Sequence, residues 1–304
     1  MRHNERPTEP RSLEEINIPP ELKLSLTGDL FLVRDSTVLN DRLLVFTTIA
    51  NSKRLSVAPY WNMDGTIKNV PTLFYQLYSI HAPVGQGNCR VFPLVYVLMT
   101  RKSEVMYKRL FQDFIDVADE NGIELNPQII VSDLEWGAIQ PSKSEFPNVN
   151  NKLCIFHIGQ RIWRRIQATG LSIRYSNEEN FSLRIRQLFA LAFLPSNEIL
   201  EPFGALKSHL PEEAEDIVMG FENNYVLGRV RKRLRNGGVI RAPPLFPPVM
   251  WSVHDSMQLG IPRMHDQVEA WYRRWENIIE RAHIGLYGII EELRKGAAAS
   301  QQSN

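Results

Sequence analysis

Hydrophobic residues in the first third of the chain fall into short runs that predict strands. Segments rich in Val, Ile, Phe and Tyr, each bounded by Gly, Pro or Asn, occupy residues 57–63, 72–81 and 91–99. Since short connections join them, we expect an antiparallel meander. Hydrophobic residues at helical spacing between 103 and 118 then predict a helix that covers one face of this sheet.

Two later runs, residues 128–131 and 152–156, are hydrophobic without alternation. Such runs are typical of strands that are buried on both faces, as in parallel sheets. The pattern therefore predicts an α/β fold with a mixed sheet, in which three antiparallel strands precede parallel strands with flanking helices.

Beyond residue 157 the spacing is helical. Four successive helices are predicted, separated by Gly170, Pro195 and Leu210-Pro211, at residues 158–168, 178–194, 196–209 and 211–225. We expect these helices to form an all-helical insertion in the α/β fold. A basic stretch and a proline-rich turn follow.

The chain ends in two further predicted helices, at residues 263–281 and 284–295. On the first, the hydrophobic face is expected to comprise Val268, Trp271, Trp275, Ile278 and Ile279.

Together these patterns divide the chain into five parts. We expect a partly flexible, charged and proline-rich lead-in at 1–44, the first part of the core at 45–170, the helical insertion with its basic stretch at 171–250, the return of the core at 251–296 and a polar tail at 297–304. Residues 23–49, which overlap the end of the lead-in, predict a small hairpin or a helix.

Composition narrows the class of protein. With 43% hydrophobic residues and a net charge of +1, the chain can bury a large core but has no global field to attract nucleic acid or membrane. The only cysteines are Cys89 and Cys154, and the longest hydrophobic run is too short to cross a bilayer. We therefore expect a soluble intracellular protein, in which any DNA affinity must come from local patches.

Two aspartates close predicted strands. Asp64 follows the first strand and Asp133 follows the run at 128–131, and carboxylates at two strand ends can hold divalent cations. Each has an alternative interpretation. Asp64 and Gly65 are typical of a hairpin turn, and Ser132 with Glu135 is typical of a helix capping box.

Glu269 is a candidate third carboxylate, because it lies at the edge of the hydrophobic face of a late helix. The alternative is an ordinary surface ion pair with Arg273, one helical turn further on.

Cys154 and His157 form a C-x-x-H motif. A structural zinc site needs four ligands and no second compact Cys/His pair follows, so the spacing disfavours zinc. We expect Cys154 to pack in a strand and His157 to start the next helix.

The basic stretch carries five charges in seven residues, namely Arg229, Arg231, Lys232, Arg233 and Arg235. It is either a solvated face or a surface for phosphate groups.

Taken in order, these segments resemble the transposase domain of Mutator-like elements, a family of eukaryotic DDE transposases with an RNase H-like core. D-G-T-I-K at 64–68 is similar to the family's D-G-T-F-K, S-D-L-E at 132–135 to the segment with the second catalytic Asp, and C-I-F-H at 154–157 to the C-x-x-H after it. The resemblance extends from about residue 45 to 295, and further similar segments lie at 74–81, 93–98, 102–107 and 190–195.

The family's third acid follows a Thr-Asn-Asn triplet on a late helix. Here Glu269 is kept, whereas Met264, His265 and Asp266 stand in place of the triplet, and Asp266 adds a negative charge beside the acids. The zinc-finger modules of full-length members are absent as well. We therefore expect a truncated or degenerate core.

The resemblance implies an RNase H-like fold in which Asp64, Asp133 and Glu269 bind two Mg²⁺ or Mn²⁺ ions and catalyse DNA cleavage and strand transfer, with Cys154, His157 and Asp266 as accessory residues. It also implies double-stranded DNA as partner (element ends and target), a homo-oligomer, and a nuclear rather than cytoplasmic location. The alternative is a domesticated or inactive DNA- or protein-binding module that keeps the fold without catalysis.

Overall fold

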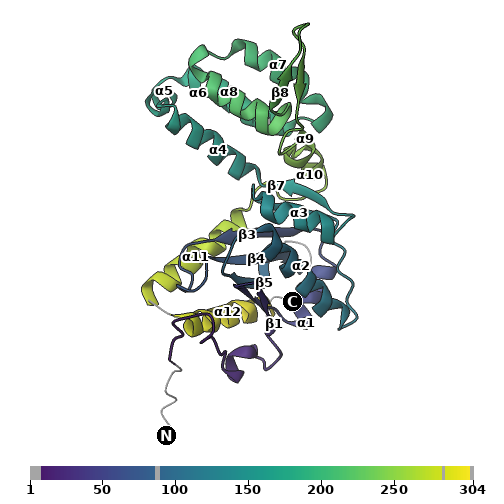
Figure 1. Ribbon diagram of the computed structural model, residues 1–304, viewed down its shortest axis with the longest axis vertical. Coiled ribbons are helices and arrows are strands. Elements are labelled where there is room, and N and C mark those ends of the chain that lie inside the picture. Colours follow the sequence, from purple (N-terminus) through teal and green to yellow (C-terminus); the bar gives the residue numbers. More distant parts are fainter. Residues whose placement is uncertain (1–7, 86–89, 283–284, 302–304) are drawn as a thin grey trace. The chain divides into compact units, whose positions relative to one another are not determined.

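The main sheet is mixed and has the strand order β1-β2-β5-β4-β3-β6-β7 (Figure 1). The computed structural model describes residues 8–85, 90–282 and 285–301, and the chain divides into two compact units, Met1–Asn151 with Asp266–Asn304, and Lys152–His265. The strands are β1 (Leu32–Val38), β2 (Asp41–Phe46), β3 (Trp61–Thr66), β4 (Gln76–Val84), β5 (Arg90–Met99), β6 (Ile129–Ser132) and β7 (Asn150–Leu153).

The pairing of the strands confirms the predicted mixed sheet. β3, β4 and β5 form the expected antiparallel meander, and β6 adds to β3 in the parallel direction. β1 and β2 form an antiparallel hairpin on the other side of the meander, so the hairpin interpretation of residues 23–49 is the correct one.

Alternation along the central strands creates two hydrophobic faces. On β5, Val95 and Val97 lie in one core cluster, whereas Tyr96 and Leu98 lie in the other. Because successive side chains of a strand point to opposite faces, both faces of the sheet must be covered by helices. The helices of the first unit are α1 (Ile49–Ser56), α2 (Glu104–Asp119), α3 (Trp136–Glu145), α11 (Asp266–Ala282) and α12 (Leu286–Gln301), with a 3₁₀ turn at Pro20–Lys23.

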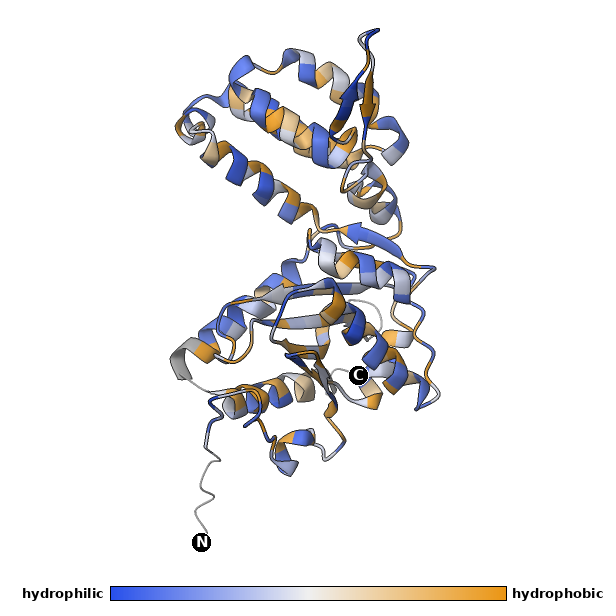
Figure 2. Cartoon of the chain, in the orientation of Figure 1, coloured by the Kyte–Doolittle hydropathy of each residue, from blue (hydrophilic) through white to orange (hydrophobic). Residues whose placement is uncertain are grey.

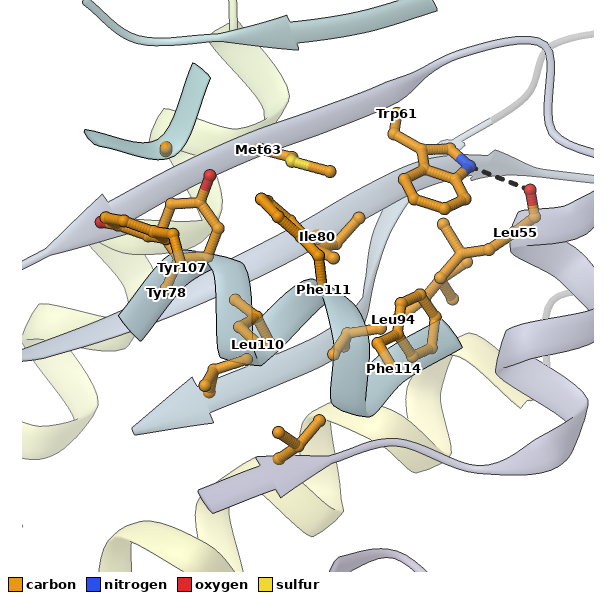
Figure 3. Packing of buried hydrophobic residues seen from close by; sticks show 14 of the residues in the cluster. Leu55, Trp61, Met63, Tyr78, Ile80, Leu94, Tyr107, Leu110, Phe111 and Phe114 are labelled. Carbon is orange, nitrogen blue, oxygen red and sulfur yellow. Dashed lines mark hydrogen bonds between the residues drawn. The ribbon is translucent and has the colours of Figure 1, made fainter. Parts of the chain in front are cut away.

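The helix α2 covers one face, as predicted. Its Leu110, Phe111 and Phe114 pack against strand side chains, and Figure 3 shows them facing the sheet. On the same face, the Trp61 indole N–H donates a hydrogen bond of 2.9 Å to the Leu55 carbonyl, which joins β3 to α1.

The two C-terminal helices α11 and α12 cover the other face. Trp275, Ile279 and Leu293 from these helices share a cluster with Leu44 and Phe46 of β2. One residue of the predicted hydrophobic face is wrong, since Ile278 is 47% exposed. Tyr272 is buried instead, because the helix presents its 268–272–275–279 stripe to the sheet.

The second unit is mainly helical. It contains α4 (Ile155–Ala168), α5 (Ser172–Asn177), α6 (Glu179–Ala190), α7 (Leu200–His209), α8 (Glu215–Phe221), α9 (Pro248–Trp251) and α10 (His254–Gln258), with 3₁₀ turns at Leu191–Phe193, Ser196–Glu198 and Glu212–Ala214 and a π-helical turn at Glu222–Val226. Hydrophobic and hydrophilic residues alternate around α4 (Figure 2), whose Ile155, Ile158 and Ile166 are buried. The predicted strand at 152–156 stops at Leu153 because its last hydrophobic residues begin this amphipathic helix.

The insertion is not all-helical as predicted. β8 (Val230–Arg233) and β9 (Val239–Arg241) pair as an antiparallel hairpin around Gly237, which has a φ of +83°. The physical reason is local, because the Asn-Gly-Gly turn at 236–238, followed by the β-branched Val239 and Ile240, favours a hairpin over a helix.

The units divide the chain at residues 151/152 and 265/266, whereas the sequence pattern placed the insertion at 171–250. No helix among the described residues is long and hydrophobic enough to cross a membrane. The predicted start of the last helix, Ile284, lies outside the described residues.

Gly296 allows α12 to approach β5 closely. A Cβ at this position would lie 2.9 Å from Oη of Tyr96, which is fully buried. We expect Gly296→Ala to destabilise the protein by about 1 kcal/mol in chemical denaturation, even though helix propensity alone favours Ala by about the same amount.

Gly204→Ala on α7 is the matched control, since a Cβ there meets nothing within 4 Å. It should stabilise the protein by up to about 1 kcal/mol. Equal stabilisation by the two substitutions would contradict a tight contact between α12 and β5.

Candidate functional site

Strand register brings the two candidate aspartates together. In the parallel pair, Met63 of β3 is opposite Ser132 of β6, so the next positions are Asp64 and Asp133. Asp64 and Gly65 continue the antiparallel pairing with β4, opposite Ser79 and Tyr78. The hairpin-turn interpretation of Asp64 is therefore wrong, because these residues lie inside a strand.

The Asp64 carboxyl group is buried on the face of the sheet that α11 covers. Trp61 and Met63 belong to the cluster under α2, so the alternate position points the other way. The residue is 6% exposed, and its Oδ1 accepts a hydrogen bond of 2.8 Å from the Gly65 N–H.

Asp133 is the first residue after β6 and is partly exposed. Its Oδ1 accepts a hydrogen bond of 3.1 Å from the Glu135 N–H, which orders the loop before α3. Ser132 belongs to β6, and the N-cap of α3 is Glu135, so the capping-box interpretation is wrong.

Glu269 lies in the first turn of α11, and its Oε1 is buried without a hydrogen-bond partner. Burial and the neighbouring Asp266 raise the pKa of Glu269, while Arg273 acts in the opposite direction. Asp266 itself is the exposed first residue of the helix.

Tyr272 ties α11 to the strand that carries Asp64. Its hydroxyl donates a hydrogen bond of 2.8 Å to the Asp64 carbonyl oxygen and lies 2.7 Å from Oγ of Ser79. Ser79 in turn lies 2.7 Å from Nε2 of His81. The sequence pattern does not single out Tyr272, although its place on the buried stripe of a helix with Glu269 is visible there.

Electrostatics couple the three acids. The pKa of Asp64 is raised well above its ordinary value, first by burial, then by the negative charge of Asp133, and also by Glu269. Like charges at one site are costly, so such clusters in folded proteins are typical of functional sites.

A cation lies beside this cluster. Nζ of Lys102, in the loop between β5 and α2, is 2.7 Å from Oε2 of Glu135, which is almost fully buried. Burial and the charge of Asp133 raise the pKa of Glu135. The sequence pattern indicates Glu135 only as a capping residue, although an acid two positions after a strand-end Asp is a usable signal.

The chemistry of these side chains fits hard divalent cations, which prefer carboxylate oxygens. Among the described residues, one group of three potential metal ligands has its ligand atoms within 4.8 Å of one another, and it consists of Cys154, His157 and His265. The oxygens of Asp64, Asp133 and Glu269 are therefore spaced more widely than that. Two ions about 3.5–4 Å apart can bridge more widely spaced carboxylates.

Residues 60–161 match the MULE transposase domain. The resemblance inferred from the motifs is confirmed over this segment, which is less than half of the chain. It includes Asp64, Asp133 and the C-x-x-H motif, whereas Glu269 lies outside it. No curated protein matches the chain.

The C-x-x-H motif of the MULE segment lies at the start of the second unit. Cys154 is the N-cap of α4 rather than a strand residue, and His157 is in the first turn of that helix, as expected. His265, the last residue of the unit, lies close to both. Counting ligands by spacing alone misses His265, since more than a hundred residues separate it from the motif.

The five residues of the basic stretch lie outside the MULE match. Arg231, Lys232 and Arg233 belong to β8, while Arg229 and Arg235 flank it, and all five are exposed. Both interpretations of this stretch, a solvated face or a phosphate-binding surface, are compatible with an exposed hairpin.

The raised pKa of Asp64 predicts how stability depends on pH. An acid whose pKa is raised by folding stabilises the protein below its unfolded pKa of about 3.9 and loses that contribution as pH rises through the folded value. We therefore expect Asp64→Asn to increase the free energy of unfolding by about 1–3 kcal/mol at neutral pH, in a buffer that contains a metal chelator. The gain should vanish as pH falls towards 4.

Asp116→Asn on the exposed side of α2 is the matched control, with an expected change within about 0.5 kcal/mol. A pH-independent effect of Asp64→Asn, or a loss of stability at neutral pH, would contradict a buried and destabilising charge.

Proposed function

We propose that the first unit is the catalytic core of a transposase-type enzyme that cleaves and joins DNA strands. The observation that carries the proposal is the coupling of Asp64 to both Asp133 and Glu269, three acids drawn from β3, the end of β6 and α11. The MULE match over residues 60–161 supports the same function.

The topology supports an RNase H-like classification of this unit. An antiparallel meander is followed by a parallel strand, and helices lie on both faces of the sheet. The first acid is on the first strand of the meander and the second follows the parallel strand. This places both at the carboxyl end of a parallel strand pair, where α/β sheets commonly bind ligands.

Asp64, Asp133 and Glu269 would hold two divalent cations, Mg²⁺ or Mn²⁺. The bound ions would supply activation of the attacking water or 3′-hydroxyl and stabilisation of the leaving oxygen. The buried Oε1 of Glu269, which has no hydrogen-bond partner, fits a ligand atom of this kind.

The surrounding residues set the charge and position of these acids. Lys102 neutralises Glu135, so that acid does not add a full negative charge beside Asp133. Tyr272 holds the Asp64 backbone against α11, which carries Glu269, and so positions two acids relative to each other. Tyr272 acts on the backbone and is a positioning residue.

The partner of this core would be double-stranded DNA, and the β8–β9 hairpin is the candidate contact surface in the second unit. Its exposed cations can neutralise phosphates without reading sequence. A transposase of this type would work in the nucleus as a homo-oligomer that pairs two element ends.

A second candidate function is a transposase-derived binding module without catalysis. The observation that favours it is Asp266, which helps raise the pKa of Glu269. An acid that resists ionisation is a poorer metal ligand, because the ligand must be deprotonated.

Substitution of Asp133 separates the two functions. We expect the full chain to nick plasmid DNA and cleave labelled duplexes with Mg²⁺ or Mn²⁺, and Asp133→Asn to reduce the rate by at least about 100-fold. In a thermal melt, Mn²⁺ should stabilise the wild-type protein more than Asp133→Asn. The second readout reports ion binding without requiring the correct DNA ends.

Asp116→Asn again serves as control and should cleave and melt like the wild type. If wild type and Asp133→Asn cleave DNA equally and show equal Mn²⁺ shifts in melting temperature, the proposal of an enzyme is wrong. The binding module without catalysis is then the function that the results support.

Charge removal on the hairpin tests the DNA surface. A plot of the logarithm of the DNA association constant against the logarithm of salt concentration has a negative slope. In Arg231→Ala/Arg233→Ala, this slope should become shallower by about 0.9 for each phosphate that the variant no longer neutralises, equally for unrelated DNA sequences. Electrophoretic mobility shifts at several salt concentrations measure this slope.

The control is Lys23→Ala/Lys53→Ala, which removes two exposed cations from the first unit. An unchanged slope in the hairpin variant, or the same change in the control, would make the hairpin a solvated face.

A further inference from the structure

Three side chains with soft or borderline donor atoms converge in the second unit. Sγ of Cys154 and one ring nitrogen each of His157 and His265 all lie within 4.8 Å of one another. Cys154 is 0% and His265 1% exposed, while His157 is partly exposed. The two imidazole rings meet edge to face, with centroids 6.2 Å apart.

Local structure explains why they converge. Cys154 is the N-cap of α4, and His157 follows three positions later in its first turn, so both side chains project from the same side of the helix start. His265 arrives from the other end of the unit. Two residues before it, the Arg263 carbonyl accepts a hydrogen bond of 3.2 Å from the Ile155 N–H, which holds the two segments side by side.

We propose that Cys154, His157 and His265 bind a divalent late transition metal ion, with Zn²⁺ the expected ion. A thiolate and two imidazoles are the ligands that Zn²⁺ prefers, whereas Mg²⁺ and Ca²⁺ prefer oxygen. Bond lengths of about 2.3 Å to sulfur and 2.0–2.1 Å to nitrogen imply ligand separations of about 3.3–3.6 Å in a tetrahedron. Small side-chain rotations bring the three atoms to that spacing, and a water molecule on the exposed side of His157 completes the coordination.

The position of the site gives it a structural role. Two ligands lie at the start of the unit Lys152–His265 and the third is its final residue. A metal ion bound here closes the whole unit into a loop, and since such a site does not exist in the unfolded chain, binding favours folding. This site is independent of the carboxylates in the first unit, so either can fail without the other.

Cobalt spectroscopy on the untagged full chain tests the proposal. The background is Cys89→Ser, which leaves Cys154 as the sole thiol of the chain. Zinc-free protein should bind one equivalent of Co²⁺ with an intense thiolate-to-cobalt charge-transfer band, and Zn²⁺ should displace it. Carboxylate-bound Co²⁺ gives no such band, so Asp133→Asn in the same background should keep it.

Single substitutions then assign the ligands. His157→Ala and His265→Ala should each weaken Co²⁺ binding by at least about tenfold, and Cys154→Ser should abolish the band. His254→Ala is the matched control, because His254 is in the same unit and pairs with Asp255. It should bind Co²⁺ like the parent protein.

A measurement on the parent protein alone avoids variants that fail to fold. Zn²⁺ should slow alkylation of Cys154 by at least about tenfold at unchanged far-ultraviolet circular dichroism. A folded parent protein that shows no thiolate band with stoichiometric Co²⁺ and no zinc protection would overturn the proposal. So would folded His157→Ala and His265→Ala proteins that bind Co²⁺ as tightly as the parent.

Discussion

The burial of the Asp64 carboxyl group is the constraint on which the first unit depends. Its charge is taken out of water on β3, beside Asp133, and folding therefore raises its pKa instead of stabilising its ionised form. Such a charge persists only where the surrounding structure is rigid enough to hold it. Two covered faces of the sheet provide that rigidity, with Trp61 anchoring β3 to α1 and Tyr272 anchoring it to α11.

This constraint explains why a late segment must return to the first unit. The strands β3 and β6 bring together two acids, but the face on which Asp64 lies is covered by helices from the end of the chain. Hydrophobic contacts of Trp275 and Ile279 seat α11 on that face, and its first turn then carries Glu269. A whole helical unit can occupy the sequence between Asp133 and Glu269 because the cost of closing a long loop grows slowly with its length.

Local patterns in the sequence predict which helices and strands form better than they predict where each one ends and what it pairs with. The meander, α2 and the mixed sheet follow from strand composition and periodicity, whereas Asp64-Gly65 suggests a turn that tertiary pairing with β4 overrides. The hydrophobic residues at 152–156 are compatible with both a strand and a helix, so the pattern does not fix where the strand ends. The Asn-Gly-Gly turn at 236–238 follows a run of basic residues, and the pattern of charges there does not indicate a hairpin. Contacts between distant segments, such as Tyr272 with Asp64, have no local signal at all.

His265 is a further residue whose contacts cannot be predicted from local sequence. In the sequence, no further Cys/His pair lies near the C-x-x-H motif, and His265 stands out only as one of the residues that replace the Thr-Asn-Asn triplet before Glu269. Folding nevertheless places His265 against Cys154 and His157. If both proposed sites bind ions, donor chemistry must sort them, since zinc binds most sites more tightly than magnesium does. A thiolate with two imidazoles retains zinc at low free concentrations, which leaves the carboxylates to the far more abundant magnesium. His265 would then serve the soft site, while the adjacent Asp266 acts on the protonation of Glu269, so the two neighbouring residues have separate consequences.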